Sequence, residues 1–195
     1  MPADANNQTG RLVVITGPAG VGKSTIVKAA RERTGVLYSV SCTTRTPRPG
    51  EVDGRDYRFV SREDFERMIA GDELLEWADV FGNFYGTPAQ PVRDALAAGK
   101  TLVLEIDVQG GLQVAARMPA ATFILIVPPD DAELRRRLVG RGTESPEVVE
   151  RRLAKSRQEI AVARQSGSYT HTVTNDDLER AIQEVVAIIQ EHRKL

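Results

Sequence analysis

The amino-acid sequence predicts an α/β fold in three layers, with a parallel five-stranded core sheet, an inserted subdomain of mixed strands and a helical lid. Short apolar runs alternate along the chain with segments of helical period, which is the pattern of a parallel sheet. A glycine-rich turn joins the first apolar run to the first helix, and two longer segments interrupt the alternation. The length of 195 residues suits one domain that carries inserted sub-structures.

The core elements follow from hydrophobic periodicity, beginning with a strand at Arg11–Thr16 (RLVVIT) that is rich in β-branched residues. A helix is expected over Lys23–Arg33, where apolar residues recur with helical period, and Gly35 stops it. Further core strands are expected at Val36–Thr43, Thr101–Asp107, Thr122–Val127 and His171–Thr174. Further core helices are expected at Pro91–Ala98, Gln109–Arg117, Asp131–Val139 and Leu178–Glu191. Because the central strands are almost continuously apolar, both faces of the sheet are expected to be covered.

Two segments break the alternation. The first contains a short strand near Tyr57–Val60, a helix at Arg62–Ala70 that Ser61 can cap, and an extended run at Glu73–Phe81. The second, GRGTE, is flanked by glycine and rich in arginine, and it leads into a long helix that starts at Ser145 and Pro146. The first segment is interpreted as an inserted subdomain and the second as a mobile lid.

These assignments divide the chain into a disordered tail at residues 1–9 and a single domain at residues 10–195. The core is expected at residues 10–44, 88–138 and 165–195, the inserted subdomain at about 45–87, and the lid at about 139–164.

Composition excludes several classes of protein. The chain is 41% hydrophobic and 27% charged, and its longest apolar runs span only a few residues, so a membrane partner is not expected. The N-terminus has neither the basic nor the apolar region of an export signal. A net charge of −1 argues against a nucleic-acid partner held by bulk positive charge. The single cysteine, Cys42, cannot form an internal disulfide, which fits a cytoplasmic location.

The turn GPAGVGKS, after the first strand, has the phosphate-loop pattern of two glycines separated by four residues and followed by Lys and Ser. Glycines let the backbone N–H groups approach phosphate oxygens, and the following helix adds a favourable dipole. Lys23 is expected to contact the β- and γ-phosphates of ATP, and the Ser24 hydroxyl to be a ligand of Mg²⁺, the predicted cofactor. The residues expected to bind ATP here are Gly17, Pro18, Ala19, Gly20, Val21, Gly22, Lys23, Ser24 and Thr25.

A phosphate loop alone does not separate a GTPase or a motor from a small-molecule kinase. The buried strand TLVLEID ends in Glu105 and Asp107, which places carboxylates at the sheet edge where α/β proteins bind ligands. Such a carboxylate can hold metal-bound water or read a substrate. No segment resembles the guanine-reading NKxD element of GTPases, and no long coupling domain follows, so a kinase is favoured.

The segment SCTTRTPRPGEVDGRDYRFV, at Ser41–Val60, resembles the nucleotide-acceptor signature of the guanylate kinase family. The resemblance extends from about Gly10 over essentially the whole chain. It includes EWADVFGNFYGTP at Glu76–Pro88, LEIDVQG at Leu104–Gly110, GRGTE in the lid, and TNDD at Thr174–Asp177. It implies the reaction of ATP with GMP, and with dGMP as a second acceptor, to give ADP and the nucleoside diphosphate. The inserted subdomain would then bind GMP.

The resemblance also implies a set of GMP-binding residues, and their chemistry suits that ligand. Guanidinium forks match a dianionic phosphate, which fits Arg45 and Arg48 near Tyr57. Guanine presents N1–H and N2–H₂ donors beside an O6 acceptor, so carboxylates and hydroxyls would distinguish it from adenine. The residues implied are Ser41, Arg45, Arg48, Glu51, Tyr57, Glu76, Tyr85, Thr87 and Asp107.

No general base is expected, because the attacking phosphate oxygen ionises near pH 6 and is already largely deprotonated. Catalysis would then be positioning and charge neutralisation by Lys23, Arg45, Mg²⁺ and arginines of the lid. The lid arginines expected to face the phosphates are Arg137, Arg141 and Arg152, and the resemblance places Asn175 at the adenine of ATP.

Two other functions stay open at this point. One is a phosphate-loop kinase that acts on another phosphorylated acceptor, for which Glu76, Thr87 and Asp107 would have no purpose. The other is a catalytically silent interaction module with this fold, against which the intact Lys23 and Ser24 argue. The nucleotides are the expected partners, and the chain is expected to be a monomer or a homodimer.

Overall fold

The computed structural model describes residues 10–80, 82–140 and 145–191. The predicted tail at residues 1–9 and the lid residues 141–144, which include Arg141, lie outside this range. The chain divides into two compact units, one of residues 1–12 and 36–103 and the other of residues 13–35 and 104–195. Among the described residues, no helix is long and apolar enough to cross a membrane.

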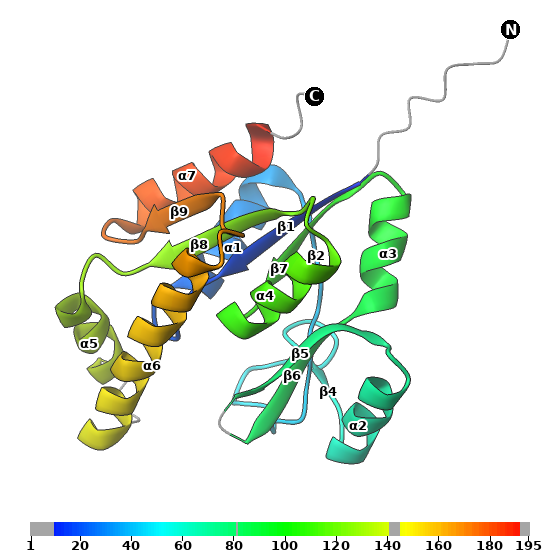
Figure 1. Ribbon diagram of the computed structural model, residues 1–195, viewed down its shortest axis with the longest axis horizontal. Coiled ribbons are helices and arrows are strands. Elements are labelled where there is room, and N and C mark those ends of the chain that lie inside the picture. The colour runs from blue at the N-terminus through cyan, green and yellow to red at the C-terminus, as the bar shows by residue number, and fades with distance from the viewer. Residues whose placement is uncertain (1–9, 81, 141–144, 192–195) are drawn as a thin grey trace, which may run out of the picture. The chain divides into compact units, whose positions relative to one another are not determined.

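The core sheet has five strands in the order β2-β7-β1-β8-β9, and Figure 1 shows the path of the chain through them. Each described pairing in it is parallel, with Val13 opposite Thr122, Ile124 opposite His171, and Leu37 opposite Leu102. The strands are β1 (Arg11–Thr16), β2 (Leu37–Tyr38), β7 (Thr101–Glu105), β8 (Thr122–Val127) and β9 (His171–Thr174). The predicted fold class, a mixed α/β fold with a five-stranded parallel sheet, is confirmed.

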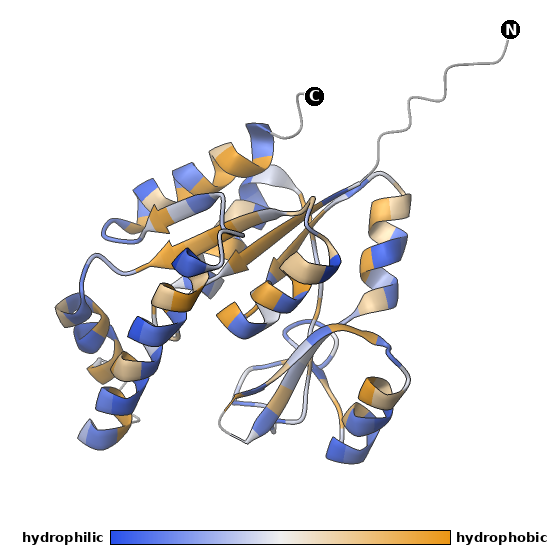
Figure 2. Cartoon of the chain, viewed as in Figure 1, coloured by the Kyte–Doolittle hydropathy of each residue, from blue (hydrophilic) through white to orange (hydrophobic). Residues whose placement is uncertain are grey.

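The second unit contains most of β1 together with β8 and β9, and five helices. They are α1 (Lys23–Thr34), α4 (Val108–Arg117), α5 (Asp131–Val139), α6 (Pro146–Gln165) and α7 (Leu178–Glu191). Helices α4 and α6 cover one face of β8 through a cluster of Val108, Leu125, Val127 and Ala163, and α1 packs against α7. Figure 2 shows β1 and β8 as mostly hydrophobic strands, as expected for strands that are buried on both faces.

The first unit contains a four-stranded sheet of order β4-β3-β6-β5 and two helices. Its elements are β3 (Cys42–Thr43), β4 (Arg58–Phe59), α2 (Arg62–Ala70), β5 (Leu74–Val80), β6 (Asn83–Pro88) and α3 (Ala89–Ala97). Ser61 caps α2 as predicted, because its hydroxyl accepts the N–H of Asp64. Cys42, Phe65 and Leu74 form the core between α2 and the sheet.

One predicted strand is wrong, and another strand was not predicted. The run Val36–Thr43 is two strands, β2 and β3, in different sheets. The N–H of Ser39 still bonds to Val103 of the first sheet, whereas the carbonyl of Ser41 accepts the N–H of Arg58 in the second. The chain therefore changes sheets within one continuous β-prone run. The strand β6 has a mixed sequence, NFYGTP, in which no period stands out.

Candidate functional site

The phosphate-loop motif folds into the turn between β1 and α1, and its glycines are needed there. Gly17 has φ 148° and Gly22 has φ 100°, in the region that side chains disfavour. A Cβ on Gly17 would lie 2.2 Å from the carbonyl oxygen of Ile126, so no side chain fits at this position. Pro18 and Val21 are buried, Gly20 and Gly22 are half-buried, and Ala19, Ser24 and Thr25 are exposed.

Lys23, the first residue of α1, folds its side chain back over the loop. Its Nζ donates to the carbonyl oxygen of Gly17 at 2.5 Å and to that of Pro18 at 3.1 Å. The ammonium group is therefore held beside the turn whose N–H groups would bind phosphate. This is the position that the motif requires of its lysine.

Ser24 and Glu105 provide the two oxygens that suit a magnesium ion. The Ser24 hydroxyl donates to Oε1 of Glu105 at 2.5 Å, so a hydroxyl and a carboxylate lie side by side at the loop. Mg²⁺ is usually held by one or two protein oxygens together with water and substrate phosphates. Among the described residues, no group of three or more His, Cys, Asp or Glu forms a site made by the protein alone. The donors present fit an ion that arrives with a nucleotide.

Arg137 and Asn175, which sequence analysis assigned to the lid and to adenine, both contact the phosphate loop itself. Arg137 donates through Nη1 to the Val21 carbonyl at 3.2 Å and through Nη2 to the Asn175 carbonyl at 2.7 Å. Its Nε donates to Glu133 at 2.7 Å. The side-chain Nδ2 of Asn175 also donates to the Val21 carbonyl, at 2.7 Å. Of the other two predicted lid arginines, Arg152 is half-buried in α6, and Arg141 lies outside the described residues.

Glu133 was not predicted as part of the site, although it orients Arg137. Hydrogen bonds from Arg136 and then Arg137 lower the pKa of Glu133 to about 2. The spacing of four residues between Glu133 and Arg137 on a helix was the available signal in the sequence. The role of the Val21 main chain carries no sequence signal at all.

In the first unit, Arg45 is held by several groups. Its Nη2 donates to Glu51 at 2.8 Å and its Nε to the Tyr85 hydroxyl at 3.1 Å. Its guanidinium carbon lies 5.5 Å from the centroid of the Tyr57 ring, which itself meets Tyr85 edge-on. The hydrogen bond from Arg45 is the main reason that the pKa of Glu51 is lowered. The exposed Arg48 bonds to the same carboxylate through its backbone N–H, at 2.7 Å.

Glu76 and Thr87 form a buried pair on the neighbouring strands β5 and β6, where they lie opposite each other in register. The Thr87 hydroxyl donates to Oε1 of Glu76 at 2.6 Å. Glu76 is 3% exposed and Thr87 is fully buried, and Ser41, just before β3, is 7% exposed. The structure thus groups eight of the nine predicted GMP residues in the first unit.

Asp107, the ninth, belongs to the second unit and is the N-cap residue of α4. Its Oδ1 accepts the backbone N–H of Gly110 at 2.7 Å. Its Oδ2 is buried and has no hydrogen-bond partner within the described part of the chain. A carboxylate oxygen that capping leaves unused is an acceptor of the kind the guanine assignment requires.

Comparison with known proteins gives one consistent family. A family model described as guanylate kinase matches residues 9–192. A guanylate kinase of Gloeobacter violaceus is 53% identical over 188 residues, which cover 96% of this chain and 90% of that protein. One of Halalkalibacterium halodurans is 50% identical over 189 residues, which cover 96% and 91%.

Solved structures agree with this assignment. The crystal structure of guanylate kinase from Anaplasma phagocytophilum matches with a TM-score of 0.77 at 31% identity, over 96% of this chain and 88% of that one. A gluconokinase from Sinorhizobium meliloti, with a TM-score of 0.53 at 16% identity, shares the fold alone.

Proposed function

The chain belongs to the guanylate kinase family, and on that premise we propose how its own residues transfer the γ-phosphate of ATP to GMP, giving ADP and GDP. The phosphate loop at residues 17–25 binds ATP. The residues around β3, β5 and β6, with Asp107, bind GMP. The observation that supports GMP as the acceptor is the buried Glu76–Thr87 pair. A kinase for another phosphorylated acceptor would have no function for this pair.

The guanine base is recognised by carboxylates that accept its N1–H and N2–H₂ donors and by hydroxyls that face O6. Glu76 and Asp107 supply the former, and Ser41 and Thr87 the latter, with the Thr87 hydroxyl turning its proton from Glu76 to O6 when guanine binds. Adenine carries a lone pair at N1 and would leave a carboxylate facing it. A well-made bidentate contact discriminates between bases by about 1–3 kcal/mol. GMP is therefore preferred over AMP, and dGMP is accepted as well.

The phosphate of GMP is held by Arg45, with Arg48, Tyr57 and Tyr85 around it. Arg45 is preorganised for this role, because Glu51 and Tyr85 already fix the plane of its guanidinium. The Arg45 guanidinium pairs with the carboxylate of Glu51 in the unliganded chain, and the phosphate of GMP would bring two further negative charges to it. No residue needs to remove a proton, because the attacking oxygen ionises near pH 6.

Lys23 neutralises charge on the β- and γ-phosphates, with Arg137, Arg141 and Arg152 as the further cations of the donor side. Ser24 and Glu105 would hold a magnesium ion brought by ATP. When bound, that ion supplies charge neutralisation of the phosphates. We place the enzyme in the cytoplasm, in keeping with the buried free thiol of Cys42, and propose that it acts as a monomer or a homodimer.

A coupled assay of ADP formation tests the proposal. ATP and Mg²⁺ are supplied with GMP, dGMP, AMP or no acceptor. Turnover is expected with GMP and dGMP, and at least about tenfold lower kcat/KM with AMP. Equal turnover with AMP and GMP would rule out the guanine-reading assignment, and turnover with none of them would rule out the proposed activity.

A further inference from the structure

The carbonyl group of Val21, inside the phosphate loop, accepts two side-chain donors from distant parts of the second unit. Arg137 of α5 donates to it through Nη1 at 3.2 Å, and Asn175, just after β9, donates through Nδ2 at 2.7 Å. Arg137 also bonds to the Asn175 carbonyl at 2.7 Å, so the two residues support each other. We call this arrangement of Arg137, Asn175 and the Val21 carbonyl the loop brace.

The loop brace fixes the direction of a peptide group. A trans peptide is planar, and its C=O and N–H point to opposite sides. When Arg137 and Asn175 hold the carbonyl of Val21, the N–H of Gly22 in the same peptide points away from them. Backbone N–H groups are what a phosphate loop offers to phosphate oxygens. The brace therefore presets the orientation of one of these donors.

Each member of the brace is fixed in place by its own contacts. Asn175 is 3% exposed, and its backbone N–H bonds to the carbonyl of Val127 at 2.9 Å. Arg137 is held through Nε by Glu133 at 2.7 Å. A Cβ on Gly22 would lie 2.5 Å from Nδ2 of Asn175, so the loop and the amide fit only because this residue is glycine. Such support is typical of preorganised binding groups.

We propose that Asn175 and Arg137 are positioning residues that shape the phosphate loop, and that Asn175 acts on the phosphates of the donor through this loop. This inference rests on the proposed function, since it assigns ATP to the same loop. A base reader would distinguish ATP from GTP. A brace would affect any ligand with a polyphosphate chain to the same degree.

The test measures binding of inorganic tripolyphosphate, which has no base, and of ATP by calorimetry. Variants are Asn175→Ala and, in case that variant does not fold, Arg137→Lys, which keeps the charge and loses the fork. Loss of one such hydrogen bond should weaken binding about five- to tenfold for tripolyphosphate and ATP alike, with the ATP-to-GTP ratio of kcat/KM unchanged. GMP affinity should stay within about twofold of the original chain.

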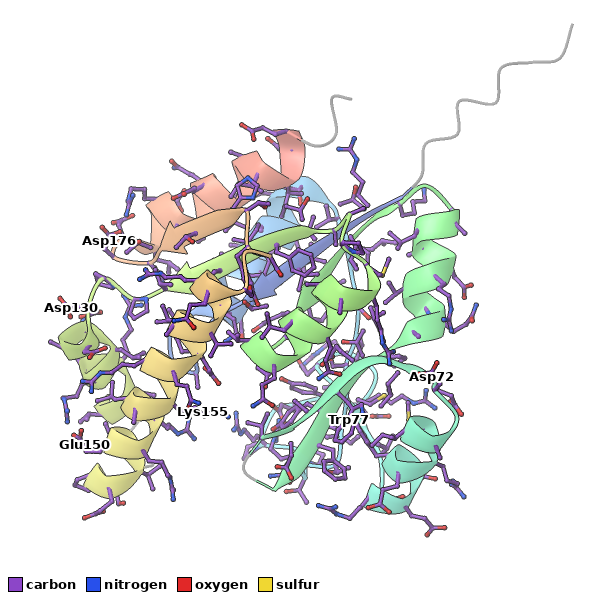
Figure 3. All side chains as sticks on the ribbon, in the orientation of Figure 1. Asp72, Trp77, Asp130, Glu150, Lys155 and Asp176 are labelled. Atoms are coloured by element: carbon purple, nitrogen blue, oxygen red, sulfur yellow. The ribbon has the colours of Figure 1, made fainter. Side chains whose placement is uncertain are left out.

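Matched controls are the neighbouring residues Asp176→Ala and Arg136→Ala. Asp176 is exposed, lies on the outside of the unit and bonds to Arg180, while Arg136 is exposed and bonds to Glu133 (Figure 3 labels Asp176). Neither bonds to Val21, Asn175 or Arg137. Arg136 is linked to the brace only through Glu133, whose bond to Arg137 remains when Arg136 is removed, so both variants should bind tripolyphosphate normally. If the brace variants lose affinity for ATP but not for tripolyphosphate, or change the ATP-to-GTP ratio, the inference is wrong. Because the calorimetry with tripolyphosphate and ATP needs neither GMP nor turnover, it can still be interpreted if the proposed activity fails.

Discussion

At the scale of single residues, Glu76 shows how a buried carboxylate is prepared for a ligand. Removing an ionised carboxylate from water is costly unless hydrogen bonds replace the lost solvent. Thr87 supplies one such bond at 2.6 Å to a carboxylate that is only 3% exposed. The donors of a bound guanine would supply more of them. A site of this kind gains from its correct ligand and is left with unpaired groups by a wrong one.

We predict that Glu76→Gln raises the KM for GMP by about 10- to 100-fold, with a smaller effect on kcat and none on the KM for ATP. Glutamine can still accept the Thr87 hydroxyl, but its amide places N–H donors against the donors of guanine. Steady-state kinetics with varied GMP at saturating ATP measure this change.

Glu66→Gln is the control for this prediction, because Glu66 is exposed on α2 and pairs with Arg62, at 3.5 Å. Its KM for GMP should equal that of the original chain. If Glu76→Gln also leaves this KM unchanged, Glu76 does not read guanine.

Some single residues of the site could be predicted from the sequence, and some of their contacts could not. Lys23 and Ser24 were identified because a motif of fixed spacing carries their chemistry. Arg137 was predicted to face the phosphates, and its side chain is 23% exposed against 47% for Arg135 and 76% for Arg136. Its contact with Val21 was beyond prediction, because the contact joins residues 116 positions apart.

At the scale of elements, α4 lies close to β1 because Gly111 has no side chain. A Cβ there would lie 2.4 Å from the Tyr169 hydroxyl oxygen and 2.7 Å from Cγ2 of Thr16. The Tyr169 ring packs edge-on against Phe123, with the ring centroids 6.0 Å apart. Burial is the main cause that raises the pKa of Tyr169 to about 12, so its hydroxyl is neutral at ordinary pH.

We predict that Gly111→Ala lowers the free energy of unfolding by about 1–3 kcal/mol through overpacking. In a Tyr169→Phe background the same substitution should cost less, since the closest atom is gone and only Thr16 remains. Urea unfolding of the four chains of this double-mutant cycle measures the difference. An equal cost in both backgrounds would show that the Tyr169 hydroxyl is not what excludes a side chain at position 111.

A second prediction at this scale concerns pH. The folded-state pKa of Glu133 is about 2, below its ordinary value of 4.5. A lowered pKa contributes stability that is fully present above pH 4.5 and is lost as the pH falls toward 2. The original chain should therefore be more stable than Glu133→Gln at pH 7, and the difference in unfolding free energy should shrink below pH 4.5.

Urea unfolding of both chains at several pH values measures this difference, in which the other titrating groups largely cancel. A difference that stays constant between pH 7 and pH 3 would contradict the prediction. A difference in unfolding free energy that grows as the pH falls would contradict it as well, because it would mean that the pKa of Glu133 is raised by folding.

Elements with one clear period were predicted well, as with α5 at Asp131–Val139 and β8 at Thr122–Val127. The strand β6 was not predicted because its residues are determined by tertiary contacts and not by a local pattern. A Cβ on Gly86 in β6 would lie 2.9 Å from the carbonyl of Glu76 and from Cζ of Phe65. Glycine there weakens the local strand signal while it permits the close approach of strand and helix. Local patterns do not record where a partner strand will lie, which is also why the split of Val36–Thr43 was not foreseen.

At the scale of the whole molecule, the two proposed nucleotide sites are distributed over the two compact units. The ATP loop and its supporting residues belong to the second unit, and the GMP residues other than Asp107 belong to the first. Each set is held together by contacts within its own unit, such as Lys23 with Gly17 and Arg45 with Glu51. Each nucleotide should therefore bind without the other.

This independence predicts a pattern in thermal unfolding. A ligand present at 100 times its Kd stabilises the folded state by about 2.7 kcal/mol. For a chain of this size that corresponds to a rise in Tm of about 5–11 °C. ATP with Mg²⁺ alone and GMP alone should each produce such a rise in the original chain. In Lys23→Ala the rise with ATP should largely disappear while that with GMP remains, and in Glu76→Gln the reverse should hold.

Circular dichroism melts with each nucleotide measure these shifts, and the Tm values without ligand show whether each variant folds. Lys28→Ala, an exposed lysine on the same helix as Lys23, serves as the control and should keep both shifts. If Lys23→Ala or Glu76→Gln removes both shifts at once while its Tm without ligand is unchanged, the two sites are not independent. The substitution would then have removed a conformation that both nucleotides require, because a ligand stabilises only a state for which it has a binding site.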